Sequence, residues 1–435
     1  MAETRKKVVV LGAGFGGLEF CKKLKREKDV EITLIDRQNH HLFQPLLYQV
    51  ATAGLSAPEI AQPIRVILAG QKNLRVVMDE VTSIDLDGKA VNSTSSRFDF
   101  DYLVIALGAT TSYFGKDEWA HHAPGLKSLD DATTIRRRLL LAFEEAAMTE
   151  DPTERQRLMT IVVVGGGPTG VEVAGACAEL CKNVLNKSFP QLDTSKARVV
   201  LVEANEILDA FDTELVRYSE EKLEEMGVEI MKWTYVEGFE HGVVKTTNGD
   251  IPAANCIWGA GVQANPVAKS MGIELGPGGR IPVDENCALK DYPHVFAIGD
   301  ITSCTDAAGN LVPGVAPAAM QMGKHAAKII RNEIRHGTDC PREGFKYFDK
   351  GMMATIGRSA AIAEAGGIQM KGFIAWIAWL FVHLLLLVGL RNRIAVFLQW
   401  LYSYVVYRRG ARIITGMDEV RRLEARGENP AHPVD

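Results

Sequence analysis

The feature that most constrains the fold of this chain is a short sequence pattern that occurs twice. An apolar run rich in β-branched residues leads into a glycine turn and an amphipathic helix at Val8–Arg26, and the same succession returns at Ile161–Leu185. After each comes a second apolar run that ends in an acid, Asp36 in the first half and Glu203 in the second. Strand, turn, helix and acid in this order are typical of a dinucleotide-binding domain.

A third landmark follows in each half, an apolar run that closes on small residues, at 101–109 and at 255–262. Three matched landmarks in one order predict two nucleotide-binding domains of the same plan. The fold class is therefore α/β, with two Rossmann-like dinucleotide-binding domains and, after them, a C-terminal helical module. The 435 residues suit roughly three domains at about 150 residues each.

The first glycine turn has a chemical task for each glycine. Gly12, Gly14 and Gly17 fit G-x-G-x-x-G, in which they allow a tight turn, close approach of a pyrophosphate and close packing of helix on strand. The pyrophosphate then lies at a helix N-terminus, where unpaired N–H groups and the helix dipole favour an anion. Asp36 is spaced to accept hydrogen bonds from ribose hydroxyls.

The second turn repeats the pattern with Gly165, Gly167 and Gly170, and Glu203 takes the place of the acid. A carboxylate here repels the 2′-phosphate of NADPH, and no arginine directly follows it, so the sequence favours NADH. The alternative is a surface acid that merely ends a strand.

Charge and cysteine usage exclude other classes. The formal net charge of −5 argues against a nucleic-acid-binding protein, which would carry a basic excess. Seven cysteines are present and no two form C-x-x-C, so a thioredoxin-type redox pair and a zinc ribbon both lack their pattern. Scattered thiols are typical of a reducing compartment. We see no signal or transit peptide in the opening "MAETRKK", and we expect the dinucleotide domains on the cytoplasmic side.

The order of these motifs resembles the two-dinucleotide-binding flavoproteins, in which the first domain binds FAD and the second binds NAD(P)H. The stretch "VFAIGD" strengthens the likeness, because in that superfamily the Gly299–Asp300 pair would contact the ribityl chain of the flavin. Within the superfamily the chain most resembles the type II NADH dehydrogenases, which reduce quinone without pumping protons. The motifs "HLFQPLLYQVATAGL", "VVVGGGPTGVEVAGA", "WGAGVQANP" and "KGFIAWIAWLFVH" carry this resemblance over nearly the whole chain.

The resemblance implies an FAD enzyme that passes two electrons from NADH to a membrane quinone. It also implies further cofactor contacts beyond the glycines and acids. For FAD these are Phe15, Gly16, Arg37, Asn39, His40, Val81 and Gly108, and for NADH they are Thr169 and Gly261.

Glu172 follows the second glycine turn and is the candidate catalytic residue. In the family the matching glutamate lies near the nicotinamide and the flavin ring, where it could orient NADH or help to deliver protons to the quinone. A carboxylate in a mostly closed site has a raised pKa and suits a proton relay. The alternative is structural, because an acid in the first turn of a helix complements the helix dipole.

Two glutamines are the candidate quinone contacts, Gln49 and Gln321. The family usually has A-Q-x-A-x-Q where this chain has "APAAMQ", so Pro317 replaces the first glutamine of that motif. The backbone near Pro317 and Ala318 is left to approach the flavin, and the usual polar contact to quinone is put in doubt. The alternative for Pro317 is an ordinary helix-start proline.

Lys371 opens the apolar tail. In the family a lysine before the tryptophan-rich helix reaches towards the pyrimidine edge of the flavin, where a cation would stabilise the anionic reduced form. The alternative is a lysine that binds lipid headgroups.

The tail itself is apolar and basic. Between 371 and 417 it contains no Asp or Glu. Its basic residues are Lys371, Arg391, Arg393, Arg408, Arg409 and Arg412. The stretch Phe373–Leu390 has 18 residues, about 27 Å as a helix against a bilayer core of about 30 Å. We expect helices that lie in the membrane interface, with basic residues on anionic headgroups. A spanning helix and a buried core or dimer interface are the alternatives.

The spacing of polar and aromatic residues favours the interface. Trp376, Trp379 and His383 fall three and four apart and share one helix face. In the second apolar segment, 394–407, Gln399 and Ser403 share a face with Asn392.

These motifs predict an FAD domain at 1–112 and 285–344, an NADH domain at 113–284, and a membrane-attachment module at 345–435. We expect a homodimer of a monotopic membrane protein on the cytoplasmic face of the cell membrane. Two other functions stay open: a sulfide:quinone-type oxidoreductase, which needs cysteines beside the flavin, and a flavoprotein of mainly binding or signalling role.

Overall fold

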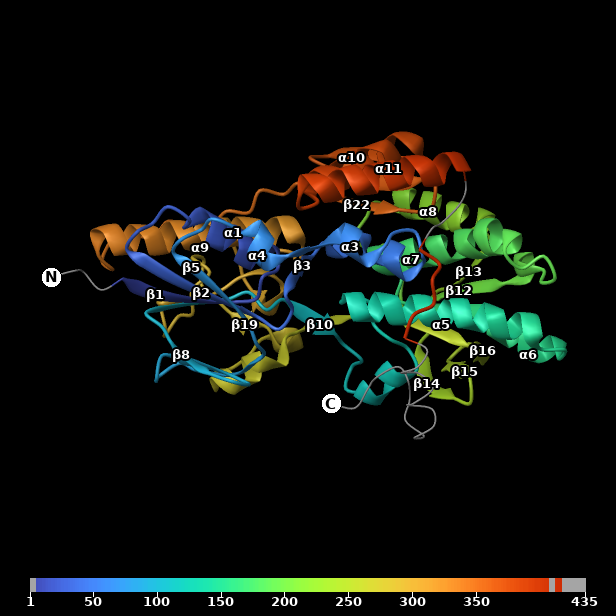
Figure 1. Ribbon diagram of the computed structural model, residues 1–435, viewed down its shortest axis with the longest axis horizontal. Coiled ribbons are helices and arrows are strands. Elements are labelled where there is room, and N and C mark those ends of the chain that lie inside the picture. The colour runs from blue at the N-terminus through green and yellow to red at the C-terminus, as the bar shows by residue number, and fades with distance from the viewer. Residues whose placement is uncertain (1–4, 407–410, 417–435) are drawn as a thin grey trace. The chain divides into compact units, whose positions relative to one another are not determined.

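The computed structural model describes residues 5–406 and 411–416, which form two compact units (Figure 1). The first unit comprises Met1–His41, Gln62–Thr110 and Val262–Lys350. The second comprises Leu42–Ala61, Thr111–Gly261 and Gly351–Asp435. The segment around Gln49 thus groups with the second unit, as does the C-terminal segment. The division into three domains stays a prediction.

The first unit is built on a five-stranded parallel sheet in the order β20-β9-β1-β2-β5. Its strands are β1 (Lys6–Leu11), β2 (Val30–Asp36), β5 (Leu74–Met78), β9 (Tyr102–Ile105) and β20 (Val295–Ala297). Val8 to Leu11 are buried, because a parallel sheet is covered on both faces and selects apolar runs. Strand order reverses beside β1, the point where such sheets bind ligands.

Helices cover one face of this sheet and a β-meander covers the other (Figure 1). The helices are α1 (Phe15–Lys23) and α9 (Ala316–His336), and the meander is β6 (Val81–Asp85), β7 (Ala90–Ser93) and β8 (Arg97–Asp99). A Cβ on Gly323 of α9 would lie 2.4 Å from the Gly16 carbonyl oxygen of α1. The two helices therefore approach as closely as their backbones allow.

The second unit repeats the plan with a four-stranded parallel sheet in the order β13-β12-β11-β17. Its strands are β11 (Thr160–Val164), β12 (Arg198–Val202), β13 (Val228–Met231) and β17 (Asn255–Trp258), and its meander is β14 (Val236–Glu240), β15 (Val243–Thr246) and β16 (Ile251–Pro252). Its longer helices are α5 (Leu129–Met148), α7 (Pro168–Glu179) and α8 (Thr213–Glu225). The predicted pairing of two nucleotide-binding folds is confirmed.

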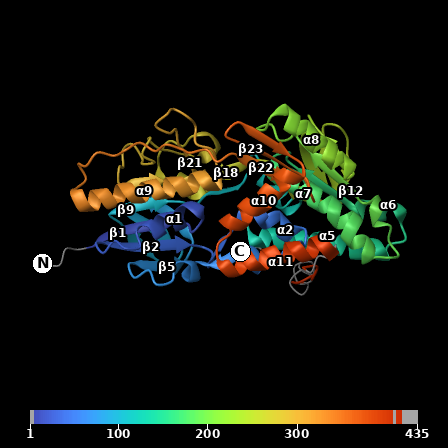
Figure 2. The ribbon, with the colours of Figure 1, turned by 90° about the horizontal axis from the view of Figure 1, so that it is seen from above.

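The C-terminal part of the second unit is a small sheet with two helices. Strands β22 (Met352–Thr355), β23 (Ala361–Ala365) and β24 (Ile368–Lys371) form an antiparallel sheet, and α10 (Phe373–Leu386) and α11 (Leu390–Val406) follow and lie beside one another (Figures 1 and 2). Within the described ranges, no helix is both long and apolar enough to cross a membrane. Arg408 and Arg409 lie outside the described residues.

Short elements complete the chain. The remaining strands are β3 (His40–Leu42), β4 (Ala61–Pro63), β10 (Ala109–Thr111), β18 (Val262–Ala264), β19 (Ile281–Pro282) and β21 (Thr302–Ser303). The remaining α-helices are α2 (Leu47–Ala51), α3 (Ala57–Ile60), α4 (Ile64–Ile67) and α6 (Pro152–Leu158). Single helical turns are η1 (Gln44–Leu46), η2 (Asp117–His121), η3 (Leu180–Val184), η4 (Leu185–Lys187), η5 (Thr194–Lys196), η6 (Pro266–Met271), η7 (Pro277–Gly279) and η8 (Gly299–Ile301).

Candidate functional site

The glycine turn of the first unit joins β1 to α1, and two of its glycines are sterically required. Gly12 has a φ of 94°, and a Cβ there would lie 2.4 Å from the Ala106 carbonyl oxygen. A Cβ on Gly17 would lie 2.0 Å from the Gly12 carbonyl oxygen. A Cβ on Gly14 would meet no atom within 4 Å. The turn is thus packed on its protein side and open at Gly14, where a pyrophosphate would approach the backbone.

The turn of the second unit has the same geometry. Gly165 has a φ of 106°, and its Cβ would lie 2.6 Å from the Ala260 nitrogen. A Cβ on Gly170 would lie 1.7 Å from the Gly165 carbonyl oxygen, whereas one on Gly167 would meet nothing within 4 Å. Both turns fit a dinucleotide by the same test, an open central glycine at the N-terminus of a helix.

The two acidic residues, Asp36 and Glu203, accept hydrogen bonds from the backbone at these turns. Asp36 accepts the Ala13 N–H at 2.6 Å and the Gln38 N–H at 2.7 Å, and burial raises the pKa of its carboxyl group in spite of these bonds. Glu203 accepts the Gly166 N–H at 2.5 Å and the Asn205 N–H at 2.8 Å. Each carboxylate therefore lies beside its glycine turn, where a ribose hydroxyl could bind.

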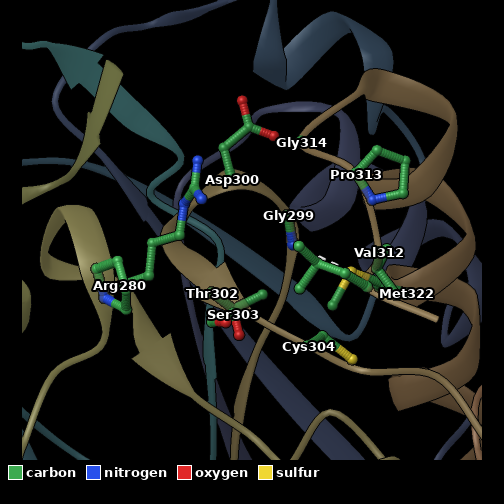
Figure 3. Close-up of a pocket in the computed structure, with 12 residues that line it drawn as sticks. Arg280, Gly299, Asp300, Thr302, Ser303, Cys304, Val312, Pro313, Gly314 and Met322 are labelled. Carbon is green, nitrogen blue, oxygen red and sulfur yellow. Dashed lines mark hydrogen bonds between the residues drawn. The ribbon is translucent and has the colours of Figure 1, made fainter. Parts of the chain in front are cut away.

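A cavity of about 170 Å³ in the first unit lies at the Gly299–Asp300 turn after β20 (Figure 3). Gly299 has a φ of 76°, and its N–H donates to the Met322 Sδ at 3.5 Å. Asp300 and Arg280 also line the cavity. A chain of polar hydroxyls, such as a ribityl chain, would find a carboxylate acceptor and a cationic donor there.

One cysteine that lines this cavity contacts a second cysteine 17 residues away in the sequence. Cys304 lines the cavity and hydrogen-bonds with Cys287, and this contact together with burial raises the pKa of the Cys287 thiol. Both cysteines are reduced, and Cys287 has a φ of 65°. Because the two cysteines do not form a C-x-x-C motif, the sequence gave no sign of this contact.

The other positions predicted for FAD lie around the turn and along the neighbouring strands. Arg37 pairs with Glu80 at 3.8 Å on an exposed rim, and His40 Nδ1 lies 3.0 Å from the Asn39 side-chain oxygen. Val81 is buried at the start of β6. The Gly108 carbonyl accepts the Asn265 N–H at 3.3 Å.

His41 is a residue that the sequence analysis missed. Its Nδ1 lies 3.0 Å from the Ala13 carbonyl oxygen, and its ring meets Phe15 edge-on at 5.0 Å. Burial lowers the pKa of this imidazole to about 4, so it stays neutral at physiological pH and donates from Nδ1. No pattern in the sequence separates His41 from His40, for which the resemblance implies a flavin contact.

Glu172 of α7 is enclosed by the C-terminal sheet and α10, although part of its surface stays accessible. The Thr355 N–H donates to its Oε1 at 3.4 Å. Burial raises the pKa of Glu172 to about 8, and Thr355 and the Trp379 indole oppose that rise. Trp379 Nε1 meets no acceptor with good hydrogen-bonding geometry among the described residues. The carboxyl group can thus hold a proton near neutral pH and release it.

Gln49 of α2 links two aromatic residues beside this site. Its Nε2 donates to the Tyr48 hydroxyl at 3.0 Å, and its Oε1 accepts from Trp400 Nε1 of α11 at 2.8 Å. Burial and then the negative charge of Glu172 raise the pKa of Tyr48. Trp379 stacks on His383 with centroids 4.1 Å apart. These contacts form an aromatic cluster between α2, α10 and α11.

Gln321 and its neighbours lie on α9 of the first unit. The amide of Gln321 exchanges two hydrogen bonds with the backbone of Phe348, each 3.0 Å long. Pro317 is in the first turn of α9, where a missing N–H costs nothing. Ala318 is buried.

Lys371 ends β24, and its Nζ pairs with Glu214 at the start of α8 at 2.5 Å. The ammonium also lies over the Tyr218 ring at 5.8 Å. Both charged groups are about half exposed. Its predicted flavin contact stays a prediction.

The two remaining positions predicted for NADH flank the second turn. Thr169 is exposed in the first turn of α7. Gly261 has a φ of 78°, and a Cβ there would lie 2.6 Å from the Phe114 ring. Thr169 is thus accessible to a ligand, and Gly261 marks a place where backbone and ring meet closely.

The helices α10 and α11 turn their polar and tryptophan-bearing faces inward. Trp379 is 1% exposed and Trp376 is buried, and Asn392 donates to the carbonyls of Pro58 and Ala61. The outer faces are apolar instead. Their exposed side chains are Phe373, Ile374, Ile377, Phe381, Val382, Leu385, Leu386, Leu390, Ile394, Phe397, Leu398, Leu401 and Tyr402. We expected the tryptophan face to meet the interface, and this was wrong, because those rings fill the core between α2, α10 and α11.

Comparisons with known proteins agree with this geometry. Residues 6–323 match the family model of the pyridine nucleotide-disulphide oxidoreductases, and residues 350–409 match that of the NDH2 C-terminal domain. The type II NADH:quinone oxidoreductase Ndh of Mycobacterium tuberculosis is 42% identical over 96% of this chain and 92% of its own length. This chain belongs to the type II NADH:quinone oxidoreductases.

A second relative and two solved structures extend the comparison. NdhA of Mycobacterium tuberculosis is 43% identical over 96% of this chain and 91% of its own length. The structure of NDH2 from Plasmodium falciparum in complex with NADH covers 95% of this chain and 100% of its own, with a TM-score of 0.86 at 19% identity. A sulfide:quinone oxidoreductase from Aquifex aeolicus has a TM-score of 0.67 at 20% identity, over 97% of this chain and 95% of its own. The two structural likenesses show the fold alone.

Proposed function

We infer that this chain oxidises NADH through FAD and reduces a quinone without pumping protons, so that NADH, one proton and quinone give NAD⁺ and quinol. The observation that carries this is the match of 96% of the chain, with both nucleotide turns and the C-terminal module, to a type II relative. When bound, FAD would supply the redox chemistry, because a flavin can accept a hydride from NADH and give two electrons to a quinone.

The first unit binds FAD in this proposal. The open backbone at Gly14 holds the pyrophosphate, Asp36 binds a ribose, and Gly299 with Asp300 holds the ribityl chain. The steric requirement for Gly12 and Gly17 and the cavity at Gly299 support this assignment. Phe15, Gly16, Arg37, Asn39, His40, Val81 and Gly108 remain proposed contacts around it.

The second unit binds NADH by the same device. Gly167 is open to the pyrophosphate and Glu203 selects NADH over NADPH by repelling a 2′-phosphate. The Glu203 carboxylate beside the turn supports this. Thr169 and Gly261 remain proposed contacts.

Glu172 holds the proton that the quinol needs beyond the hydride. Its raised pKa and its partial accessibility support this role. Gln49 and Gln321 are the proposed quinone contacts. Both amides are hydrogen-bonded within the protein, so a quinone carbonyl has to compete with Trp400 and with the Phe348 backbone.

The apolar outer faces of α10 and α11 attach the enzyme to a lipid surface as a peripheral, monotopic protein. Ile374 is 72% exposed and Phe381 is 63% exposed, a cost in water that burial in lipid removes. Lys371 and Arg391 are exposed on the same module, and basic residues near anionic headgroups add attraction. Attachment at the cytoplasmic face and a homodimer remain parts of the proposal.

The sulfide:quinone alternative has little support in the second unit. Cys177 and Cys181, the cysteines nearest to the second turn, are buried in the core. A core thiol is shielded from a polar substrate.

The decisive experiment for the activity is NADH-driven reduction of a short-chain quinone by the detergent-solubilised full chain, compared with sulfide as donor. We expect rapid turnover with NADH and none with sulfide. Slow NADH oxidation that quinone leaves unchanged would instead support a binding or signalling role.

Flotation with vesicles tests attachment. We expect the protein to float with anionic vesicles, and Ile374→Glu with Phe381→Glu to release it. Met148→Glu changes an exposed apolar residue of α5 and should have no effect. Retention of the double variant, or equal release by the control, would contradict attachment through α10. Light scattering of the detergent complex gives the oligomeric state directly.

A further inference from the structure

Trp233 combines high exposure with a backbone conformation that is unusual for a bulky residue. The residue is 63% exposed, and its φ is 55°. The left-handed region strains any residue with a large side chain, and an exposed tryptophan gains little burial in return. Strain of this kind gathers at ligand sites, where the rest of the structure holds it.

The backbone on both sides of Trp233 is fixed to Glu203. The Glu203 N–H donates to the Met231 carbonyl at 2.9 Å, and the Thr234 N–H donates to the Glu203 carbonyl at 2.9 Å. Trp233 therefore projects from a loop that is bonded, before and after it, to the residue proposed to bind the ribose.

The side chains beside Trp233 are fixed as well. Lys232 pairs with Glu206 at 2.8 Å and with Glu220 at 2.6 Å. Asn248 donates to the Thr234 hydroxyl at 2.7 Å. The side chains of Lys232 and Thr234 thus bond to other residues of the protein, whereas the Trp233 indole faces solvent.

The order of the strands indicates which part of a bound dinucleotide could contact this indole. The glycine turn follows β11, Glu203 follows β12, and Trp233 lies just after β13, the next strand outward in the sheet. A dinucleotide with its pyrophosphate on the turn and its ribose on Glu203 has its base beyond the ribose, in the direction of β13.

We propose that Trp233 is the platform on which the adenine of NADH stacks. This rests on the proposed assignment of the second turn to NADH. The flat indole covers one face of the base, and stacking on an aromatic ring is a strong contact that needs no hydrogen bond. Because the adenine takes no part in hydride transfer, Trp233 raises affinity and leaves the chemical step unchanged.

The test compares NADH with reduced nicotinamide mononucleotide, which has the same hydride donor and no adenosine. Trp233→Gly and Trp233→Phe are made in the full-length holoenzyme, with Met148→Ala as the control for loss of an exposed apolar side chain. For Trp233→Gly we expect the KM for NADH to rise about tenfold, equivalent to about 1.4 kcal/mol, at unchanged kcat. Trp233→Phe and Met148→Ala stay close to the parent, and all four proteins have equal kcat/KM for the mononucleotide.

Calorimetry with ADP-ribose measures the same contact without turnover, and Trp233→Gly should bind it about tenfold more weakly. Glycine also relieves the strained φ, so loss of affinity cannot come from misfolding if the thermal midpoint is held or raised. Unchanged KM and ADP-ribose affinity in Trp233→Gly, or an equal loss with both donors, would overturn the proposal. A parent that binds ADP-ribose through Trp233 and yet oxidises neither donor would contradict the proposed function and leave the stacking contact standing.

Discussion

The two nucleotide-binding units share one turn and differ in what lies around it. In the first unit the residue two places after β5 is Glu80, which pairs with Arg37, and a second turn at Gly299 adds a cavity. In the second unit the residue two places after β13 is the exposed Trp233. Under the proposed assignment, FAD, which stays bound, is held from two turns, whereas NADH, which leaves at every cycle, has one turn and an open edge.

The largest effects should come from closing the open glycines. Gly14→Ala and Gly167→Ala each add a methyl group that meets no protein atom, so both variants fold, but each methyl group enters the space for a pyrophosphate. We expect Gly14→Ala to purify without flavin and without activity. Gly167→Ala should keep its flavin, and its KM for NADH should rise about a hundredfold. Flavin absorbance per protein and steady-state kinetics measure both, and an exchange of the two phenotypes would reverse the assignment of the units.

Glu172→Gln should lower kcat by about a hundredfold, the lower end of what a general acid contributes. The parent needs the protonated acid, so its rate should fall as the pH rises through about 8, and the variant should lack this limb. A variant with the parent's rates at every pH would remove Glu172 from the mechanism.

The same carboxyl group gives a stability test with a definite sign. Since its pKa is raised in the folded protein, the folded state holds a proton that the unfolded state has lost between the ordinary carboxyl pKa and about pH 8. Stability therefore falls as the pH rises across this window. Thermal melts of parent and Glu172→Gln should diverge there, with the variant flatter. Parallel melts would contradict the raised pKa.

Glu203→Gln should have a smaller effect, confined to the second unit. The amide keeps the shape and loses the charge, so we expect the KM for NADH to rise about tenfold and the preference over NADPH to weaken. Flavin content should stay unchanged. An unchanged ratio of kcat/KM for the two nucleotides would mean that Glu203 does not select between them.

Lys371→Gln should have the smallest effect if its contacts are those that the described residues show, an ion pair with Glu214 and the nearby Tyr218 ring. Exposed ion pairs contribute little, so the thermal midpoint and kcat should match the parent. A marked shift of the flavin's reduction potential in this variant would instead support the flavin contact predicted from the family resemblance.

The sequence could predict the paired folds because glycine is irreplaceable where a Cβ has no room, as at Gly17 and Gly170. It could not predict which face of α10 is buried, since Trp379 and Phe381 are both large and apolar and only tertiary packing separates them. The sequence marks Lys371 as a candidate residue. It could not predict the ion pair of Lys371 with Glu214, which is distant along the chain. Trp233 gave no signal, because its exposure and its φ are properties of the folded loop.

A flavin held by this chain should carry the electrons from NADH to quinone. An anaerobic titration of the purified, detergent-solubilised protein tests it directly by following the visible absorbance of the flavin. We predict that one equivalent of NADH bleaches the flavin and that one equivalent of a short-chain quinone then restores it fully. A flavin that NADH bleaches and quinone leaves bleached, or a protein that carries no flavin, would contradict the account.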